Sequence, residues 1–119
     1  MRALNHPELG SVELATVLNA LADPLRLRVV GQLAEAGGVV CGAFDVPVSM
    51  STLSHHLKVL REAGLLRVIP QGSFRRHELR LDEVENRFPG VLRSVIDCVE
   101  DDQCSLGELA PRSRRQGAP

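Results

Sequence analysis

The segment from Ser49 to Arg61 constrains the fold of this chain more than any other, because it reads as a capped helix with two different faces. Leu53, Leu57 and Leu60 follow one another at i, i+4 and i+7 and would form one apolar stripe. Small polar side chains cover the rest of its first turns. Such groups at the start of a helix suit the major groove of DNA, where bulky side chains would hinder the approach to base edges. The segment therefore predicts a DNA-recognition helix anchored through its leucines.

Two stretches carry a resemblance to a known family. Residues 51–65, STLSHHLKVLREAGL, resemble the recognition helix of the ArsR/SmtB family of metal- and thiol-responsive winged-helix repressors, and residues 21–30, LADPLRLRVV, resemble a segment that precedes it in that family. The resemblance extends over roughly residues 12–100. It implies a mostly α fold with a small β-hairpin, a winged helix-turn-helix, which dimerises through its first and last helices.

The length of 119 residues fits one domain. Aromatic residues make up 3% of the chain, with no Trp and no Tyr, so a core must be built from Leu and Val. Such a small domain buries a limited share of its surface, which a dimer would extend. We expect a flexible N-terminus over residues 1–10, the winged helix-turn-helix domain over residues 11–104, and a disordered tail over residues 105–119.

Cap and turn signals predict two helices at the start of the domain. The first is capped by Ser11 and runs to about Ala22. The second starts at Asp23-Pro24 and runs to about Ala36, where Gly37-Gly38 ends it. The side chains expected to face inward are Val12, Ala15, Leu18 and Leu21 on the first helix and Leu25, Val29, Val30 and Leu33 on the second.

The segment before the recognition helix departs from the family. An edge strand is expected at residues 39–41, and residues 42–48 are too few for the full scaffold helix that the family places there. We expect a one-turn helix or an ordered loop that places Phe44 in the core. After the recognition helix, strands at residues 65–69 and 74–79 would form the wing around a turn. A helix at residues 81–88 and a last helix would follow, the latter with the apolar stripe Val91, Leu92, Val95, Ile96 and Val99.

Charge is segregated along the chain although the net charge is −1. Residues 55–80 carry six Lys and Arg side chains against two Glu, a local charge of +4, whereas residues 81–110 sum to −6. A positive field confined to one segment is what contact with phosphates needs. The alternative is a solvated surface that is merely segmented.

The candidate DNA contacts follow from these positions. Ser51, Thr52, Ser54 and His55 are the candidates for base edges, and the cap residue Ser49 is a further candidate DNA contact. Lys58 and Arg61 would contact phosphates, and Arg75 and Arg76 on the wing would reach phosphate or an adjacent minor groove, unless they serve solubility alone. His56 would either pack or touch phosphate. A dimer would place two such helices about one turn of double-stranded DNA apart, so the expected operator is an imperfect palindrome.

The three cysteines leave three readings open. Cys41, Cys98 and Cys104 could bind arsenite or a soft metal ion, since soft thiolates favour such ligands. Cys98 could instead form a disulfide or polysulfide bridge with Cys104 or Cys41. The third reading is plain packing of Cys98 at the dimer interface. His55 and His56 are adjacent on a helix and do not converge, which speaks against chelation by that pair.

Several classes of protein are disfavoured. No run approaches the roughly 18 apolar residues of a membrane helix, residues 1–7 lack the apolar stretch of a secretory signal, and an odd number of Cys argues against a complete disulfide framework. We therefore expect a cytoplasmic protein without a membrane partner. No G-x-S-x-G elbow is present, so we expect no enzyme. The alternative to a repressor is a winged-helix protein-interaction module that does not bind DNA.

Overall fold

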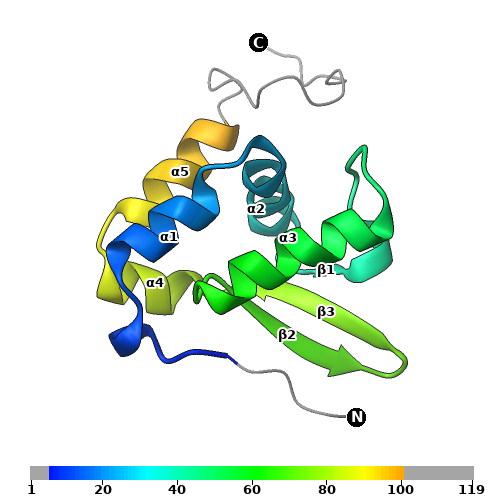
Figure 1. Ribbon diagram of the computed structural model, residues 1–119, viewed down its shortest axis with the longest axis horizontal. Helices are drawn as coiled ribbons and strands as arrows, with labels where there is room; N and C mark the ends of the chain where they lie inside the picture. Colours follow the sequence, from blue (N-terminus) through cyan, green and yellow to red (C-terminus); the bar gives the residue numbers. More distant parts are fainter. Residues whose placement is uncertain (1–5, 101–119) are drawn as a thin grey trace.

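The computed structural model describes residues 6–100 and shows helices packed on a small antiparallel sheet (Figure 1). In chain order the elements are η1 (Leu9–Ser11), α1 (Leu14–Leu21), α2 (Pro24–Ala36), β1 (Val39–Val40), η2 (Cys41–Ala43), α3 (Met50–Glu62), β2 (Leu66–Gln71), β3 (Phe74–Leu79), α4 (Leu81–Arg87) and α5 (Val91–Glu100), where η marks a 3-10 helix. The β2–β3 hairpin follows α3 directly, so the predicted winged helix-turn-helix is confirmed. No helix within residues 6–100 is long and apolar enough to span a bilayer.

The second helix begins and ends where its cap residues predict. The Asp23 carboxylate accepts hydrogen bonds from the backbone N–H groups of Leu25 (2.8 Å) and Arg26 (3.1 Å), and Pro24 occupies the first helical position. At the other end Gly37 has φ +79°, a conformation that L side chains rarely adopt. Both ends of α2 are therefore set by local sequence.

The wing is part of a three-stranded sheet. Strands β2 and β3 pair antiparallel from Leu66–Leu79 at the base to Gln71–Phe74 at the tip, where Gly72 turns the chain with φ +64°. Val39 and Val40 pair with β3 on its other edge, giving the order β1-β3-β2. The expected edge strand is thus present, and it extends the predicted hairpin by one short strand.

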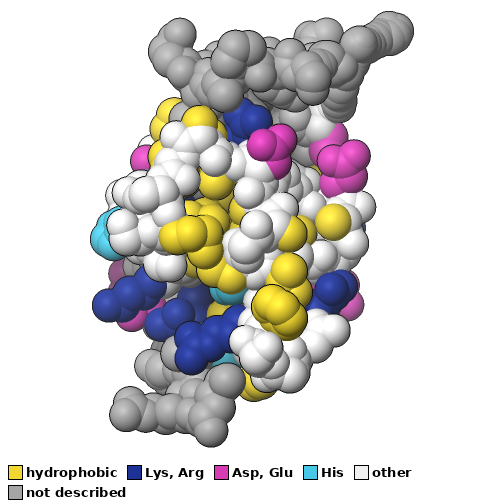
Figure 2. Space-filling model, turned by 90° about the vertical axis from the view of Figure 1, so that its right-hand side faces the viewer, with side chains coloured by type: hydrophobic (Ala, Val, Ile, Leu, Met, Phe, Trp, Pro, Cys, Tyr) yellow, Lys and Arg dark blue, Asp and Glu magenta, His cyan; other side chains and the backbone are white. Residues whose placement is uncertain are grey.

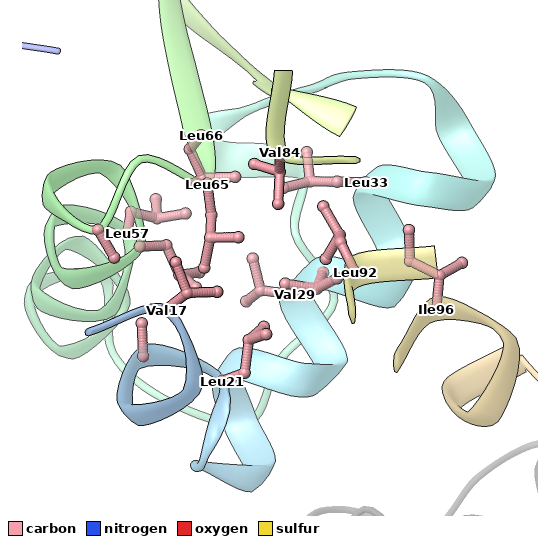
Figure 3. Packing of buried hydrophobic residues seen from close by; sticks show 14 of the residues in the cluster. Val17, Leu21, Val29, Leu33, Leu57, Leu65, Leu66, Val84, Leu92 and Ile96 are labelled. Carbon is pink, nitrogen blue, oxygen red and sulfur yellow. The ribbon is translucent and has the colours of Figure 1, made fainter. Parts of the chain in front are cut away.

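Leu and Val side chains from both helices and strands form the core. Figure 3 shows them pointing toward one another between α1, α2, α3 and α5. Leu60, Leu65 and Leu92 are fully buried, as the near absence of aromatic residues requires. Gly31 lies where α2 meets α5, and a Cβ atom there would lie 2.6 Å from Val99 Cγ1. Glycine at this position lets the two helices approach closely.

The first helix differs from the prediction in its start and in its buried face. Ser11 ends η1, and its hydroxyl donates to the Glu8 carbonyl at 2.8 Å instead of capping α1. The buried side chains are Val17, Ala20 and Leu21, whereas Ala15 and Leu18, predicted to face inward, are exposed. Leu14 is exposed too. Helix α1 therefore has two apolar faces, and only one of them packs into the core of the subunit.

Residues 6–12 are attached to the wing base and α4. The Val68 N–H donates to His6 Nε2 at 3.0 Å on the free edge of β2, and Arg80 donates to the Pro7 carbonyl at 2.8 Å. Burial is the main reason why the pKa of His6 lies below its usual value, and nearby arginines contribute. The sequence predicted a loose segment up to residue 10; its described part instead makes these contacts. The predicted tail over residues 105–119 lies outside the described residues.

Candidate nucleic-acid interface

Helix α3 presents its polar face outward as predicted. Leu53, Leu57 and Leu60 are buried against the core, while Thr52 and His55 are exposed. The Ser49 hydroxyl accepts the Thr52 N–H at 3.2 Å and so caps the helix. The exposed polar and charged side chains of α3 and its cap are Ser49, Ser51, Thr52, Ser54, His55, Lys58 and, at the far end of the helix, Glu62. The arrangement leaves one helical face free for a ligand that approaches from solvent.

The hydroxyl groups at the start of α3 are bonded to one another. Ser49 Oγ lies 3.2 Å from Ser51 Oγ and donates to Thr52 Oγ1 at 3.1 Å. This cluster satisfies much of the hydrogen-bonding capacity of the first turn before any ligand arrives. Ser54 and His55, one turn further along, lie outside the cluster.

His56 is partly buried and packs against α2 rather than standing free on the exposed side of α3. Its Nδ1 lies 3.0 Å from Arg26 Nη1, and Arg26 Nε also donates to the Ala20 carbonyl at 2.6 Å. Burial is the largest cause that lowers the pKa of His56; Asp23 opposes this shift, and Arg26 and His55 reinforce it. Of the two roles predicted for His56, the structure shows packing. The side chain ties α3 to the junction of α1 and α2.

The cations of this region are not equally available. Arg61 is 15% exposed and lies 3.9 Å from Glu62, so it presents little of its side chain to solvent. The Arg76 guanidinium pairs with the Glu78 carboxylate at 3.2 Å and lies against Gly38. Arg75 is exposed near the wing tip. At the base of the wing Arg67 pairs with both Glu78 and Glu83, and Arg80 pairs with Glu83. Lys58 and Arg75 are the predicted phosphate contacts that the structure leaves exposed.

The short segment before α3 is held by side chains of α2. Gln32 donates to the Asp45 carbonyl at 2.7 Å and accepts the Asp45 N–H at 2.9 Å. Arg28 also donates to that carbonyl at 3.2 Å. The Phe44 ring packs on the core and meets the His77 ring edge-on, with centroids 5.9 Å apart. The prediction left open a one-turn helix or an ordered loop: a single 3-10 turn covers Cys41–Ala43, the chain continues without a helix to Ser49, and Phe44 packs on the core as predicted. The sequence did not predict the contacts to Asp45.

The cysteines are not brought together in the described part of the chain. Cys41 is half-buried in η2, and Cys98 is exposed on α5. Cys104 lies outside the described residues. Within residues 6–100, no group of three or more His, Cys, Asp or Glu side chains is placed to hold a metal ion. The predicted thiolate site at Cys41, Cys98 and Cys104 stays a prediction.

Comparisons with known proteins agree with this geometry. Residues 21–69, from the end of α1 to β2, match a family described as a helix-turn-helix domain. An uncharacterised HTH-type transcriptional regulator of Methanocaldococcus jannaschii is 33% identical over 73 residues, which are 60% of this chain and 82% of the relative. The arsenical resistance operon repressor of Bacillus subtilis is 33% identical over 82 residues, 67% of this chain and 74% of the relative.

A third relative extends the similarity along the chain. The transcriptional repressor SmtB homologue of Synechocystis is 33% identical over 100 residues, 80% of this chain and 73% of the relative. All three relatives are named as transcriptional regulators and none as an enzyme. With its winged helix-turn-helix architecture and its outward polar α3, the chain belongs to the ArsR/SmtB family of helix-turn-helix transcriptional regulators.

Proposed function

We propose that the chain is a homodimeric repressor that inserts α3 into the major groove of an imperfect palindromic DNA operator. The observation that carries this proposal is the exposed polar face of α3, with Thr52 and His55 pointing to solvent while the leucines of the same helix anchor it. Ser54 and His55 are the base-edge candidates least engaged by the cap. Lys58 and Arg75 supply exposed positive charge for phosphates.

Two apolar rows support the dimer. Leu14 and Leu18 are exposed on α1 and lie one turn apart. On α5, Val91, Val95 and Cys98 follow at i, i+4 and i+7 and are half-buried or exposed. Both helices lie at the end of the molecule away from the wing tip (Figure 1). A second subunit on these rows would leave α3 and the wing free for DNA.

Removing Lys58 or Arg75 should weaken DNA binding and flatten its salt dependence. Each phosphate contact contributes about 0.9 to the slope of log K against log salt, so Lys58→Gln or Arg75→Gln, present twice in a dimer, should reduce that slope by about 2. The measurement is a titration of a duplex that the protein selects from a random-sequence pool, at several salt concentrations. Arg93→Gln, an exposed arginine on α5, is the matched control.

The same titration separates the repressor from a protein-interaction module. A module without DNA binding would enrich no sequence from the pool. Its weak residual binding would be as sensitive to Arg93→Gln as to Lys58→Gln. Either result would count against the proposed function.

We also propose that release from the operator acts through the thiol of Cys98, by binding a soft metal or metalloid or by oxidation. Its thiol is exposed and shares a row with Val91 and Val95, so a change at this atom would bear on the proposed subunit contact. A trigonal arsenite site would need further thiolates, for which Cys104, Cys41 or the second subunit are the candidates.

Native mass spectrometry of the full chain, after exposure to arsenite, Cd, Zn or a polysulfide, tests this role. We expect a change of mass with at least one of them that is lost in Cys98→Ser: a gain for a bound ion or for added sulfur, or the loss of two hydrogen atoms when a disulfide forms. A protein whose mass is unchanged by all four reagents would leave Cys98 with a packing role only.

A further inference from the structure

Met50 is unusual among the residues of α3 because it is apolar and yet exposed. It is the first residue of the helix and 52% of its surface is accessible. Single exposed apolar side chains are common on protein surfaces, so what sets Met50 apart is its position at the start of the helix proposed to enter the groove, close to the exposed Val48. Figure 2 shows the face that carries the start of α3 and the wing tip: hydrophobic side chains gather in its middle, and most of the visible Lys and Arg side chains lie in its lower half.

Folding does not explain Met50. The helix is anchored further along by Leu53, Leu57 and Leu60, and the cap is made by the Ser49 hydroxyl. Met50 is absent from the buried core and from the partly buried residues packed against it. Its side chain is therefore available to a ligand.

The hydroxyl groups next to Met50 are already hydrogen-bonded, which limits the polar contacts that the first turn can make with such a ligand. Ser49, Ser51 and Thr52 are bonded to one another around the cap. The flexible, polarisable thioether of Met50 is the longest side chain that the first turn extends toward solvent. At this point the helix offers an apolar contact in addition to hydrogen bonds.

One base edge in the major groove takes such a contact. The 5-methyl group of thymine is the apolar feature of that groove, and apolar side chains recognise it. We propose that Met50 is a specificity-determining residue that contacts a thymine methyl group in each half of the operator, an inference that rests on the proposed function.

The test removes the methyl group from the DNA and the side chain from the protein separately and together. The duplex is one selected from a random pool by the full-length protein, and thymines are replaced by uracil at symmetric positions of the two half-sites. Burial of one methyl group corresponds to about a fourfold effect on affinity, so the loss of two should weaken wild-type binding by roughly 15-fold at the contacted position. Met50→Ala should weaken binding to the thymine duplex similarly, and should bind the uracil duplex no worse than the thymine duplex.

Two variants serve as matched controls. Met50→Leu keeps an apolar side chain and should retain the preference for thymine over uracil. Phe74→Ala removes another exposed apolar side chain, on the wing, and should leave the uracil effect unchanged. Because Met50 is exposed, thermal unfolding of Met50→Ala should match that of the wild type.

The outcomes distinguish this inference from the function on which it rests. A uracil effect that persists undiminished in Met50→Ala at every position overturns the inference, as does a selected duplex whose wild-type affinity is indifferent to uracil throughout. In both cases the protein still binds a specific duplex, and the proposed function stands. A pool from which no sequence is enriched overturns both.

Discussion

Replacing Leu14 and Leu18 together by glutamate is expected to convert the proposed dimer into folded monomers and to lower affinity for the proposed palindromic operator by at least about 100-fold. The two side chains are 42% and 48% exposed, so the substitutions remove little from the core of the subunit. In a dimer interface the same positions would place unpaired carboxylates in an apolar contact, which is strongly unfavourable. Each monomer would then hold only one half-site, and the gain from simultaneous binding would be lost.

Sedimentation equilibrium gives the oligomeric state, circular dichroism gives the helix content, and titration of the selected duplex gives the affinity. Thr16→Glu is the matched control, since Thr16 is exposed on another side of α1 and should leave both dimer and affinity intact. A Leu14→Glu, Leu18→Glu protein that still sediments as a dimer would show that the subunits meet elsewhere.

Signals carried by a few neighbouring residues predicted much of the fold. Asp23-Pro24 and Gly37 mark the ends of α2 because capping and a left-handed conformation depend on those residues themselves. The same holds for Ser49 at the start of α3 and for the turn at Gly72. In the structure, these helix ends and this turn lie at the residues that the local sequence predicts.

Features that depend on distant contacts were harder to predict. α1 carries two overlapping apolar rows, Leu14–Leu18 and Val17–Leu21, and periodicity alone cannot say which row the subunit buries. The hydrogen bonds of Gln32 to Asp45 join residues thirteen positions apart and have no local signature. The sequence therefore gave no account of how the shortened segment before α3 is held.

The candidate interface shows the same division. The outward face of α3 followed from helical periodicity, but the local charge of residues 55–80 overstated the cations available to DNA. Pairing of β2 with β3 sets Arg67 opposite Glu78, and the same carboxylate also meets Arg76. His56 was ambiguous until the fold placed Arg26 beside it. Which charges are neutralised is a property of strand register and helix packing.

Leu60→Ala is expected to destabilise the protein by about 2–5 kcal/mol, a large part of the roughly 5–15 kcal/mol that holds a typical domain folded. Leu60 is fully buried, and its truncation would leave a cavity beneath α3. Urea unfolding at one fixed protein concentration measures the loss, since the stability of a dimer depends on concentration. Val59→Ala, at the neighbouring half-buried position, should cost less. If α3 is anchored through its leucines, operator affinity in Leu60→Ala should fall in step with the folded fraction. A loss of stability below about 1 kcal/mol would contradict that anchoring.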